Sequence, residues 1–147
     1  MIPDPKSAGW ALDPQIERDT TPVGDLPLCR LLLMNDANYP WLLLVPRRHH
    51  AVEIADLDDI EQARLMGEIA ETSRSLKAIT ACDKINVAAL GNVVAQLHVH
   101  VIARQRGDAA WPKPVWGVVA AKQYEEPAAA TLMAELRRRL AVAPVQS

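Results

Sequence analysis

The alternation of apolar and polar residues along the chain predicts four β-strands. Two apolar runs, at residues 28–34 and 41–45, are separated by residues 35–40, which are rich in Asn, Asp and Pro. We therefore expect these runs to form a hairpin or two adjacent strands joined by a loop. Two later segments, at residues 84–88 and 97–103, predict the third and fourth strands.

Helical spacing of apolar residues predicts two helices. The first is expected over residues 56–80, with Asp56 as its N-cap and apolar residues recurring every three or four positions. That apolar face comprises Ile60, Leu65, Ile69, Leu76 and Ile79. The second is expected from Pro127 to Leu140 and carries three arginines in its last turns. This order of elements predicts an α+β fold, with an antiparallel β-sheet, one long central helix and a C-terminal helix, both on one face of the sheet.

Length and composition narrow the class of protein. A chain of 147 residues, half of them hydrophobic, predicts a single domain over residues 1–147, with residues 1–27 irregular because they are rich in Pro and Asp. The net charge of −2 gives no basis for non-specific nucleic-acid binding. Without a signal peptide or a membrane-spanning apolar run, we expect a cytoplasmic protein. Cys29 and Cys82 are expected to be free thiols buried as small hydrophobic residues.

The candidate chemistry lies in the fourth strand. Residues 96–102 read Gln-Leu-His-Val-His-Val-Ile, and successive side chains of a strand point to opposite faces. Gln96, His98 and His100 therefore share one face, while their apolar neighbours enter the core. Imidazoles held side by side can transfer protons, bind a metal or attack an electrophile. They can equally be two histidines on an exposed sheet face, and the strand pattern alone does not separate these possibilities.

Three segments together resemble the histidine triad family of nucleotide hydrolases and transferases. The signature of that family is His-x-His-x-His followed by two apolar residues, and residues 96–102 match it with Gln in place of the first His. Residues 42–49, Leu-Leu-Leu-Val-Pro-Arg-Arg-His, resemble the apolar strand of the family that ends in Pro, two basic residues and His. Asn86 and the turn at residues 91–92 resemble its Asn and Gly-Gln segment.

The resemblance covers residues 28–104, with residues 105–147 left as a C-terminal segment and helix, and it implies a mechanism. His98 would attack the α-phosphorus of a nucleotide and form a covalent nucleotidyl-imidazole intermediate. His100 and the amide of Gln96 would donate hydrogen bonds to phosphoryl oxygens. No metal or other cofactor is implied, because the attacking atom is an imidazole nitrogen.

The resemblance also implies a set of residues around the phosphate and nucleoside. Asn92 and nearby backbone N–H groups would hold the phosphate, Asp36 or Asn35 would bind a ribose, and His49 would support the site. The full set is Asn86, Asn92, Asp36, Trp41 and His49.

Two departures from the family pattern leave three functions open. Gln96 stands at the first triad position, and Trp41 stands where many members have another active-site His. The first candidate is an enzyme acting at the α-phosphate of a dinucleoside polyphosphate or nucleoside phosphoramidate. The second is a nucleotide-binding module with weak or lost catalysis. The third is a zinc-dependent hydrolase, which would need a third ligand such as His49. For all three we expect a small-molecule substrate or ligand, and the resemblance adds a homodimer whose sheets adjoin.

Overall fold

The computed structural model describes residues 4–146 and contains one five-stranded antiparallel sheet in the order β1-β2-β3-β5-β4. The strands are β1 (Thr20–Asp25), β2 (Cys29–Met34), β3 (Trp41–Pro46), β4 (Lys84–Ala88) and β5 (Val99–Arg104). The helices are α1 (Pro14–Asp19), α2 (Asp59–Thr80) and α3 (Ala128–Leu140), with short 3₁₀ turns η1 (Pro5–Ser7) and η2 (Ile54–Asp56). The expected α+β class and antiparallel sheet are confirmed.

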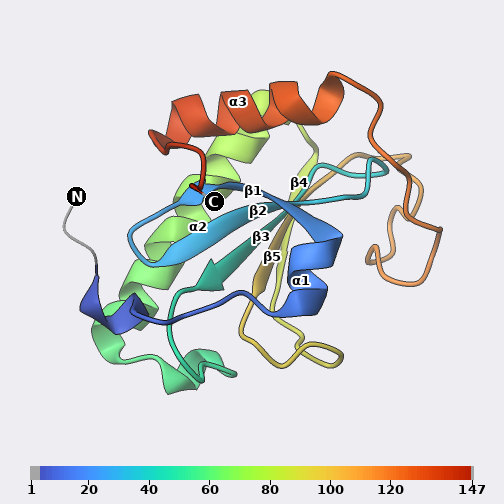
Figure 1. Ribbon diagram of the computed structural model, residues 1–147. Coiled ribbons are helices and arrows are strands. Elements are labelled where there is room, and N and C mark those ends of the chain that lie inside the picture. The colour runs from blue at the N-terminus through green and yellow to red at the C-terminus, as the bar shows by residue number, and fades with distance from the viewer. Residues whose placement is uncertain (1–3, 147) are drawn as a thin grey trace.

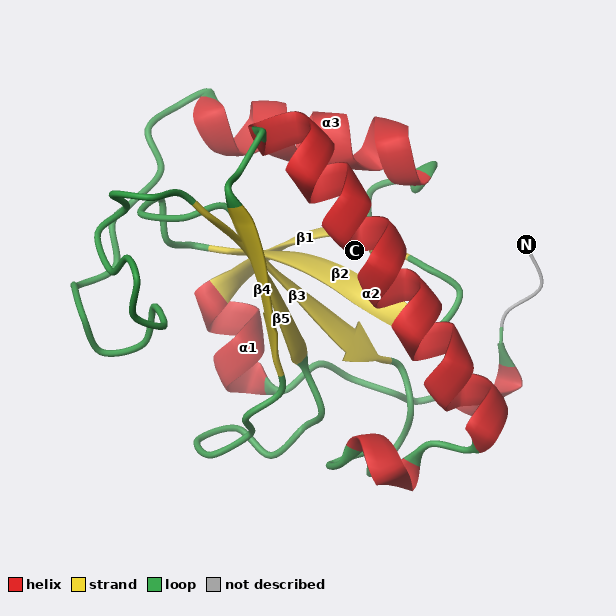
Figure 2. Cartoon of the chain, turned by 180° about the vertical axis from the view of Figure 1, so that it is seen from behind, coloured by secondary structure: helices red, strands yellow, loops and turns green. Residues whose placement is uncertain are grey.

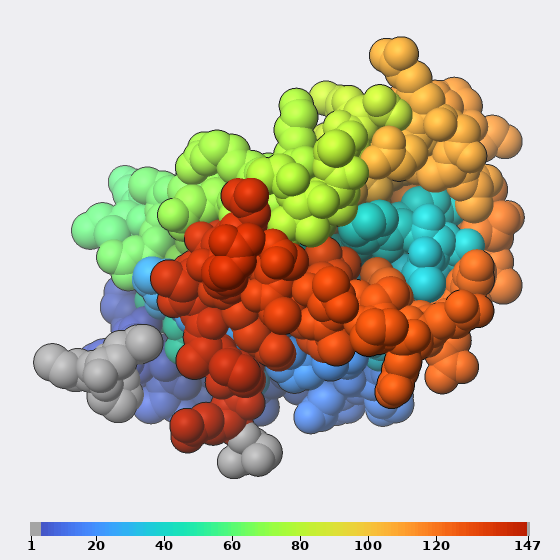
Figure 3. Space-filling view, turned by 90° about the horizontal axis from the view of Figure 1, so that it is seen from above, coloured from blue at the N-terminus to red at the C-terminus, as the bar shows by residue number. Residues whose placement is uncertain are grey.

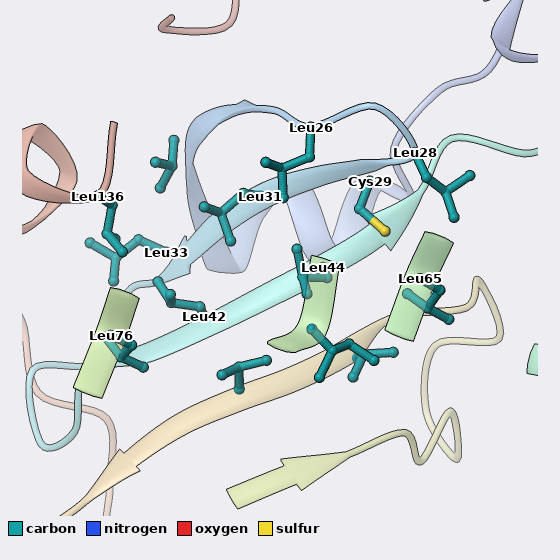
Figure 4. Packing of buried hydrophobic residues seen from close by; sticks show 14 of the residues in the cluster. Leu26, Leu28, Cys29, Leu31, Leu33, Leu42, Leu44, Leu65, Leu76 and Leu136 are labelled. Atoms are coloured by element: carbon teal, nitrogen blue, oxygen red, sulfur yellow. The ribbon is translucent and has the colours of Figure 1, made fainter. Parts of the chain in front are cut away.

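The two long helices cover one face of the sheet, and α1 lies on the other (Figure 1; Figure 2). From above, α3 lies beside α2 along that covered face (Figure 3). Leu65, Leu76 and Leu136 from these helices pack against Leu31 and Leu44 of the sheet (Figure 4). The alternation of the strands therefore sends one set of side chains toward α2 and α3, and the other set toward α1 and the later loops.

The central strands are buried on both faces, which explains their unbroken apolar runs. All six residues of β3 and all six of β5 are buried. On the face away from α2 and α3, Leu43 and Ile102 pack with Ile16 of α1 and Val115 of a later loop. His100 points to this second face, since its neighbours Val99 and Val101 belong to the core under the long helices.

The N-terminal part of the chain is more ordered than expected. Residues 14–25 form α1 and β1, so the prediction of an irregular segment over residues 1–27 is wrong there. The Asp13 side chain caps α1 by accepting the N–H of Gln15, and β1 pairs with β2 on both sides of an irregularity between Pro22 and Gly24. A helix of six residues is too short to show a helical period in the sequence. The cap stabilises α1, and pairing with β2 stabilises β1.

The long helix begins later than expected. Its N-cap is Asp58, which forms a capping box with Glu61, whereas Asp56 belongs to the preceding 3₁₀ turn. Ile60 is 73% exposed and so does not share the buried face of Leu65 and Leu76.

The fourth predicted strand, β5, also begins later than expected, at Val99, so Gln96 and His98 precede it. Both cysteines are free and buried, as expected.

Candidate active site

His98 and His100 lie side by side at the start of β5, with ring centroids 5.0 Å apart. Both are largely buried, at 9% and 5% exposure, which removes the interpretation of two histidines on an open surface. They line a pocket of about 330 Å³ on the face away from α2 and α3. The other lining residues come from α1, β1, β2, β3 and two loops: Gln15, Ile16, Asp19, Thr20, Met34, Trp41, Leu43, Leu90, Gly91, Asn92, Val93, Val94 and Trp116.

His98 is held by a backbone group. Its Nδ1 lies 2.7 Å from the carbonyl oxygen of Gln96, two residues earlier. A carbonyl oxygen can only accept, so Nδ1 carries the proton and donates it. In the neutral ring the other nitrogen, Nε2, then has a free lone pair, which is the state that a nucleophilic imidazole requires.

His100 has a different partner. The indole Nε1–H of Trp41, from the neighbouring strand β3, donates to its Nδ1 at 3.0 Å. Burial, followed by the neighbouring His98, lowers the pKa of His100 to about 4. His100 is therefore uncharged at neutral pH.

Trp116 closes the pocket over these groups. Its ring packs edge-on against His100, at a centroid distance of 4.9 Å, and against Trp41, at 5.7 Å. It also lines a neighbouring pocket of about 490 Å³ with Arg18 and Asp36. Local sequence patterns do not distinguish Trp116 from Trp111, because both follow β5 in a Pro-rich loop.

The side chain of Gln96 does not lie where a phosphate donor was expected. Its Oε1 accepts the N–H of Asp13 at 2.8 Å, and its Nε2 donates to the carbonyl of Ala11 at 3.0 Å. Both ends of the amide thus bind the N-terminal segment, and Gln96 does not line the pocket of His98. The expectation that Gln96 donates to a phosphoryl oxygen disagrees with this geometry.

Three other expected site residues also serve different contacts. The amide oxygen of Asn86 accepts from Arg104 at 2.8 Å, and Asp36 accepts the backbone N–H groups of Asn38 and Lys122. His49 is exposed, and its Nε2 contacts the carbonyl of Ala8. None of the three lines the pocket of His98, whereas Asn92 and Trp41 do. Asp36 instead lines the neighbouring pocket, beside Trp41 and Trp116.

The residues that sequence reasoning missed come mainly from the N-terminal part. Ile16 and Asp19 of α1 form one wall of the pocket. Met34 at the end of β2 and Val94 in the loop between β4 and β5 contribute further apolar surface. The Asp13-Pro14 pair, which favours a helix start, was the available signal for α1.

The third function considered, a zinc-dependent hydrolase, would need a third metal ligand beside His98 and His100. Between residues 4 and 146, no three His, Cys, Asp or Glu side chains gather in a group able to hold a metal ion. His49, the third ligand considered from the sequence, lines a separate pocket with Arg48 and Gln96.

Over residues 4–146, no helix is both long enough and apolar enough to cross a bilayer.

Comparison with known proteins agrees with this geometry. Over residues 15–107 the chain matches the family model described as "HIT domain". A histidine triad protein from Bradyrhizobium japonicum is 56% identical, with a TM-score of 0.88, over 89% of this chain and 98% of that one. A histidine triad protein from Sinorhizobium meliloti is 44% identical, with a TM-score of 0.88, over 90% of this chain and 98% of that one. A histidine triad protein from Marinobacter aquaeolei is 42% identical, with a TM-score of 0.87, over 91% of this chain and 98% of that one.

Among curated proteins, the chain resembles an "AP-4-A phosphorylase" of Mycobacterium tuberculosis, with 36% identity over 81 residues. That match covers 48% of this chain and 41% of the relative, so the relative is considerably longer than the matched part. The family match begins at residue 15, within α1, and so includes the N-terminal elements that the sequence resemblance left out. The matched residues include His98, His100 and the whole sheet, and the chain belongs to the histidine triad (HIT) family.

Proposed function

We propose that the protein is a nucleotide hydrolase or nucleotidyl transferase that attacks the α-phosphorus of its substrate with Nε2 of His98. The observation that carries this proposal is the hydrogen bond from Nδ1 of His98 to the carbonyl of Gln96. It leaves the Nε2 lone pair free and facing a pocket, and it becomes stronger as the ring gains positive charge during attack.

The reaction would proceed in two displacements. The Nε2 lone pair forms a bond to phosphorus, and the bond from phosphorus to the leaving group breaks, with its electron pair going to the leaving group. Water or another acceptor then attacks the same phosphorus and releases its proton to solvent, while the P–N bond breaks and its electron pair returns to Nε2 of His98. His100 and Asn92 line the same pocket, and in this proposal they donate hydrogen bonds to phosphoryl oxygens.

The walls of the pocket support a nucleotide as the ligand. Ile16, Met34, Leu43 and Val94 offer apolar surface to a base or ribose next to the two histidines. The relative named AP-4-A phosphorylase supports a dinucleoside polyphosphate, and a nucleoside phosphoramidate fits the same chemistry. We assign Asn86, Asp36 and His49 no direct part in binding at the pocket of His98, because each contacts protein groups elsewhere.

Three further expectations remain part of this proposal. The chain forms one domain over residues 1–147 and acts as a homodimer, for which the free edge of β4 provides a surface. A cytoplasmic location accords with two unpaired thiols, Cys29 and Cys82. Catalysis needs no resident metal, so turnover is expected to survive prolonged treatment with a chelator.

The test uses diadenosine tetraphosphate and adenosine 5′-phosphoramidate as substrates. Wild-type protein is expected to turn over at least one of them and to show a nucleotidyl adduct by mass spectrometry after rapid acid quenching. His98→Ala is expected to lose both turnover and adduct while keeping its circular dichroism spectrum. His50→Asn is a matched control, because His50 is exposed and its positive φ of 59° is one that Asn tolerates.

The same experiment separates the second candidate, a nucleotide-binding module without catalysis. That candidate is supported by Gln96, whose amide is occupied by the N-terminal segment. If wild-type protein binds AMP in calorimetry but shows neither turnover nor adduct on either substrate, the binding module is correct. Turnover that is unchanged in His98→Ala would refute the proposed nucleophile.

A further inference from the structure

The contact between Trp41 and His100 determines where His100 carries its proton. The indole nitrogen of Trp41 lies 3.0 Å from Nδ1 of His100, in a buried position. An indole N–H is a donor only and has no lone pair to offer. Nδ1 must therefore be the unprotonated nitrogen, and the proton of the neutral ring lies on Nε2.

The two neighbouring histidines thus hold opposite tautomers. His98 is protonated on Nδ1, because that nitrogen faces the carbonyl of Gln96. His100 is protonated on Nε2, because its Nδ1 receives the indole proton. At His98 the free Nε2 is a nucleophile, whereas at His100 the Nε2–H is a hydrogen-bond donor.

The surroundings of His100 favour the neutral ring. On its own segment the titratable neighbour is His98, whose charge would repel a second cation. From β3 and the later loop it meets the rings of Trp41 and Trp116. From α1 the pocket contains Asp19, whose carboxylate accepts from the Gln15 amide. Among residues 4–146, no carboxylate is hydrogen-bonded to His100 to stabilise an imidazolium.

We propose that Trp41 is a positioning residue that holds His100 as the Nε2–H tautomer, so that His100 donates to a phosphoryl oxygen without changing its charge. This inference rests on the proposed function for the identity of the ligand, but the tautomer itself does not. Trp41 takes the position where many family members have a histidine. In this chain that position supplies a donor that cannot ionise.

A consequence follows for the departure of the leaving group. A neutral imidazole is a very weak acid, so His100 held in this form does not protonate the leaving group. The amide of Gln96 cannot do so either, since it does not ionise and is bound to the N-terminal segment. Turnover in the wild-type protein should therefore show no pH inflection that arises from His100 above pH 5.

The first test needs no substrate. In protein labelled with ¹⁵N-histidine, two-dimensional NMR distinguishes the protonated from the unprotonated ring nitrogen of each residue. The NMR signals of His100 are assigned by their absence from the spectrum of His100→Asn. For His100 we expect a protonated Nε2, an unprotonated Nδ1 and no titration between pH 5 and 8. A protonated Nδ1, or titration near pH 6.5, would overturn the proposal even if the protein is an active nucleotidyl enzyme.

The second test removes the donor. Trp41→Phe keeps an aromatic ring and lacks the N–H, so both tautomers of His100 should be populated. The pKa of His100 should also rise, because protonation of Nδ1 no longer has to displace the hydrogen bond from the indole. Trp116→Phe is the matched control, because Trp116 contacts His100 through its ring and makes no hydrogen bond to it. The tautomer of His100 should remain that of the wild type in Trp116→Phe.

Kinetics give an independent readout. We expect Trp41→Phe to lower kcat about tenfold, as typical for one lost hydrogen bond, with KM nearly unchanged and a new inflection in the pH profile of kcat. Trp41→His, which can again donate an N–H, should recover part of the rate. If Trp41→Phe keeps both the wild-type tautomer and a flat pH profile, Trp41 does not position His100. If Trp41→Phe does not fold, the wild-type NMR measurement decides the question alone.

Discussion

Gln96 binds the N-terminal segment with both ends of its side-chain amide, and this contact affects the site from a distance. The segment it holds, Ala11 to Asp13, leads directly into α1, which supplies Ile16 and Asp19 to the pocket. A residue at the first triad position thus supports the wall of the pocket that His98 lines. Its effect should appear in stability and ligand affinity.

Replacing Gln96 by Ala tests this role. Two hydrogen bonds are lost, each worth about 1 kcal/mol, so the free energy of unfolding should fall by about 2 kcal/mol. AMP should bind more weakly because the wall formed by α1 is less firmly held. Urea unfolding and calorimetry measure the two effects. A loss of kcat above a hundredfold with unchanged stability and affinity would instead place Gln96 in the chemistry.

At the scale of elements, the end of β5 anchors the loop that carries Trp116. Arg104 is 1% exposed and makes two hydrogen bonds with Asp108, at 2.8 and 3.0 Å, and a third with Asn86. Its guanidinium also lies over the rings of Tyr39 and Trp111, 5.6 Å from each centroid. This cluster connects β5, β4 and the loop between β2 and β3 to the residues that precede Trp116.

Arg104→Met is expected to destabilise the protein by about 3–5 kcal/mol, because it leaves Asp108 largely buried without its cation. Arg104→Lys should recover little, since an ammonium cannot make the paired hydrogen bonds of a guanidinium. Urea unfolding gives the free energies. Arg138→Met is the control, because the Arg138–Glu135 ion pair is exposed and should contribute less than about 1 kcal/mol. Equal effects of Arg104→Met and Arg138→Met would contradict a structural role for the cluster.

The same ion pair predicts a dependence of stability on acid. Hydrogen bonds from Arg104 hold the pKa of Asp108 at about 2, below its ordinary value. Because the folded pKa is the lower one, the unfolded chain takes up the proton first as pH falls. The stabilisation is therefore complete above about pH 4 and is lost as pH falls toward 2. Unfolding measured from pH 5 to pH 2 should show a smaller loss of stability in Asp108→Asn than in the wild type.

At the scale of the whole molecule, the sheet ends on one side at β4, where strand pairing can continue into a second copy. The strand is short, and the side chain of Val87 on it is 49% exposed. Exposed apolar side chains beside an unpaired strand edge favour association. We propose this edge as the interface of the homodimer that the family resemblance implies.

Light scattering at micromolar concentration should therefore give twice the mass of the single chain. Val87→Lys should shift the protein toward the monomer, because a charge on the edge strand opposes pairing. Val118→Lys is the matched control, since Val118 is an exposed apolar residue in the loop after β5. A monomeric wild-type protein would refute the dimer, and an unchanged dimer in Val87→Lys would place the interface elsewhere.

Local patterns in the chain were enough to predict β2 to β5, the two long helices and the shared face of His98 and His100. These features repeat every two residues or every three to four, so a short window of sequence contains them. The motif at residues 96–102, with the Pro-Arg-Arg-His segment upstream, was enough to indicate the family. Each of these depends on residues that are close along the chain.

The contacts that define the site depend on residues far apart along the chain, and only the folded structure brought them together. Trp41 and His100 are 59 positions apart, and Gln96 and Asp13 are 83 apart. Neither pair leaves a periodic signal, because strand order and loop packing decide which side chains meet. An amide or an indole forms its hydrogen bonds with whatever donor or acceptor the fold supplies. The family motif therefore indicated which residues to consider, and the packing of β3, α1 and the Trp116 loop decided which of them face the pocket.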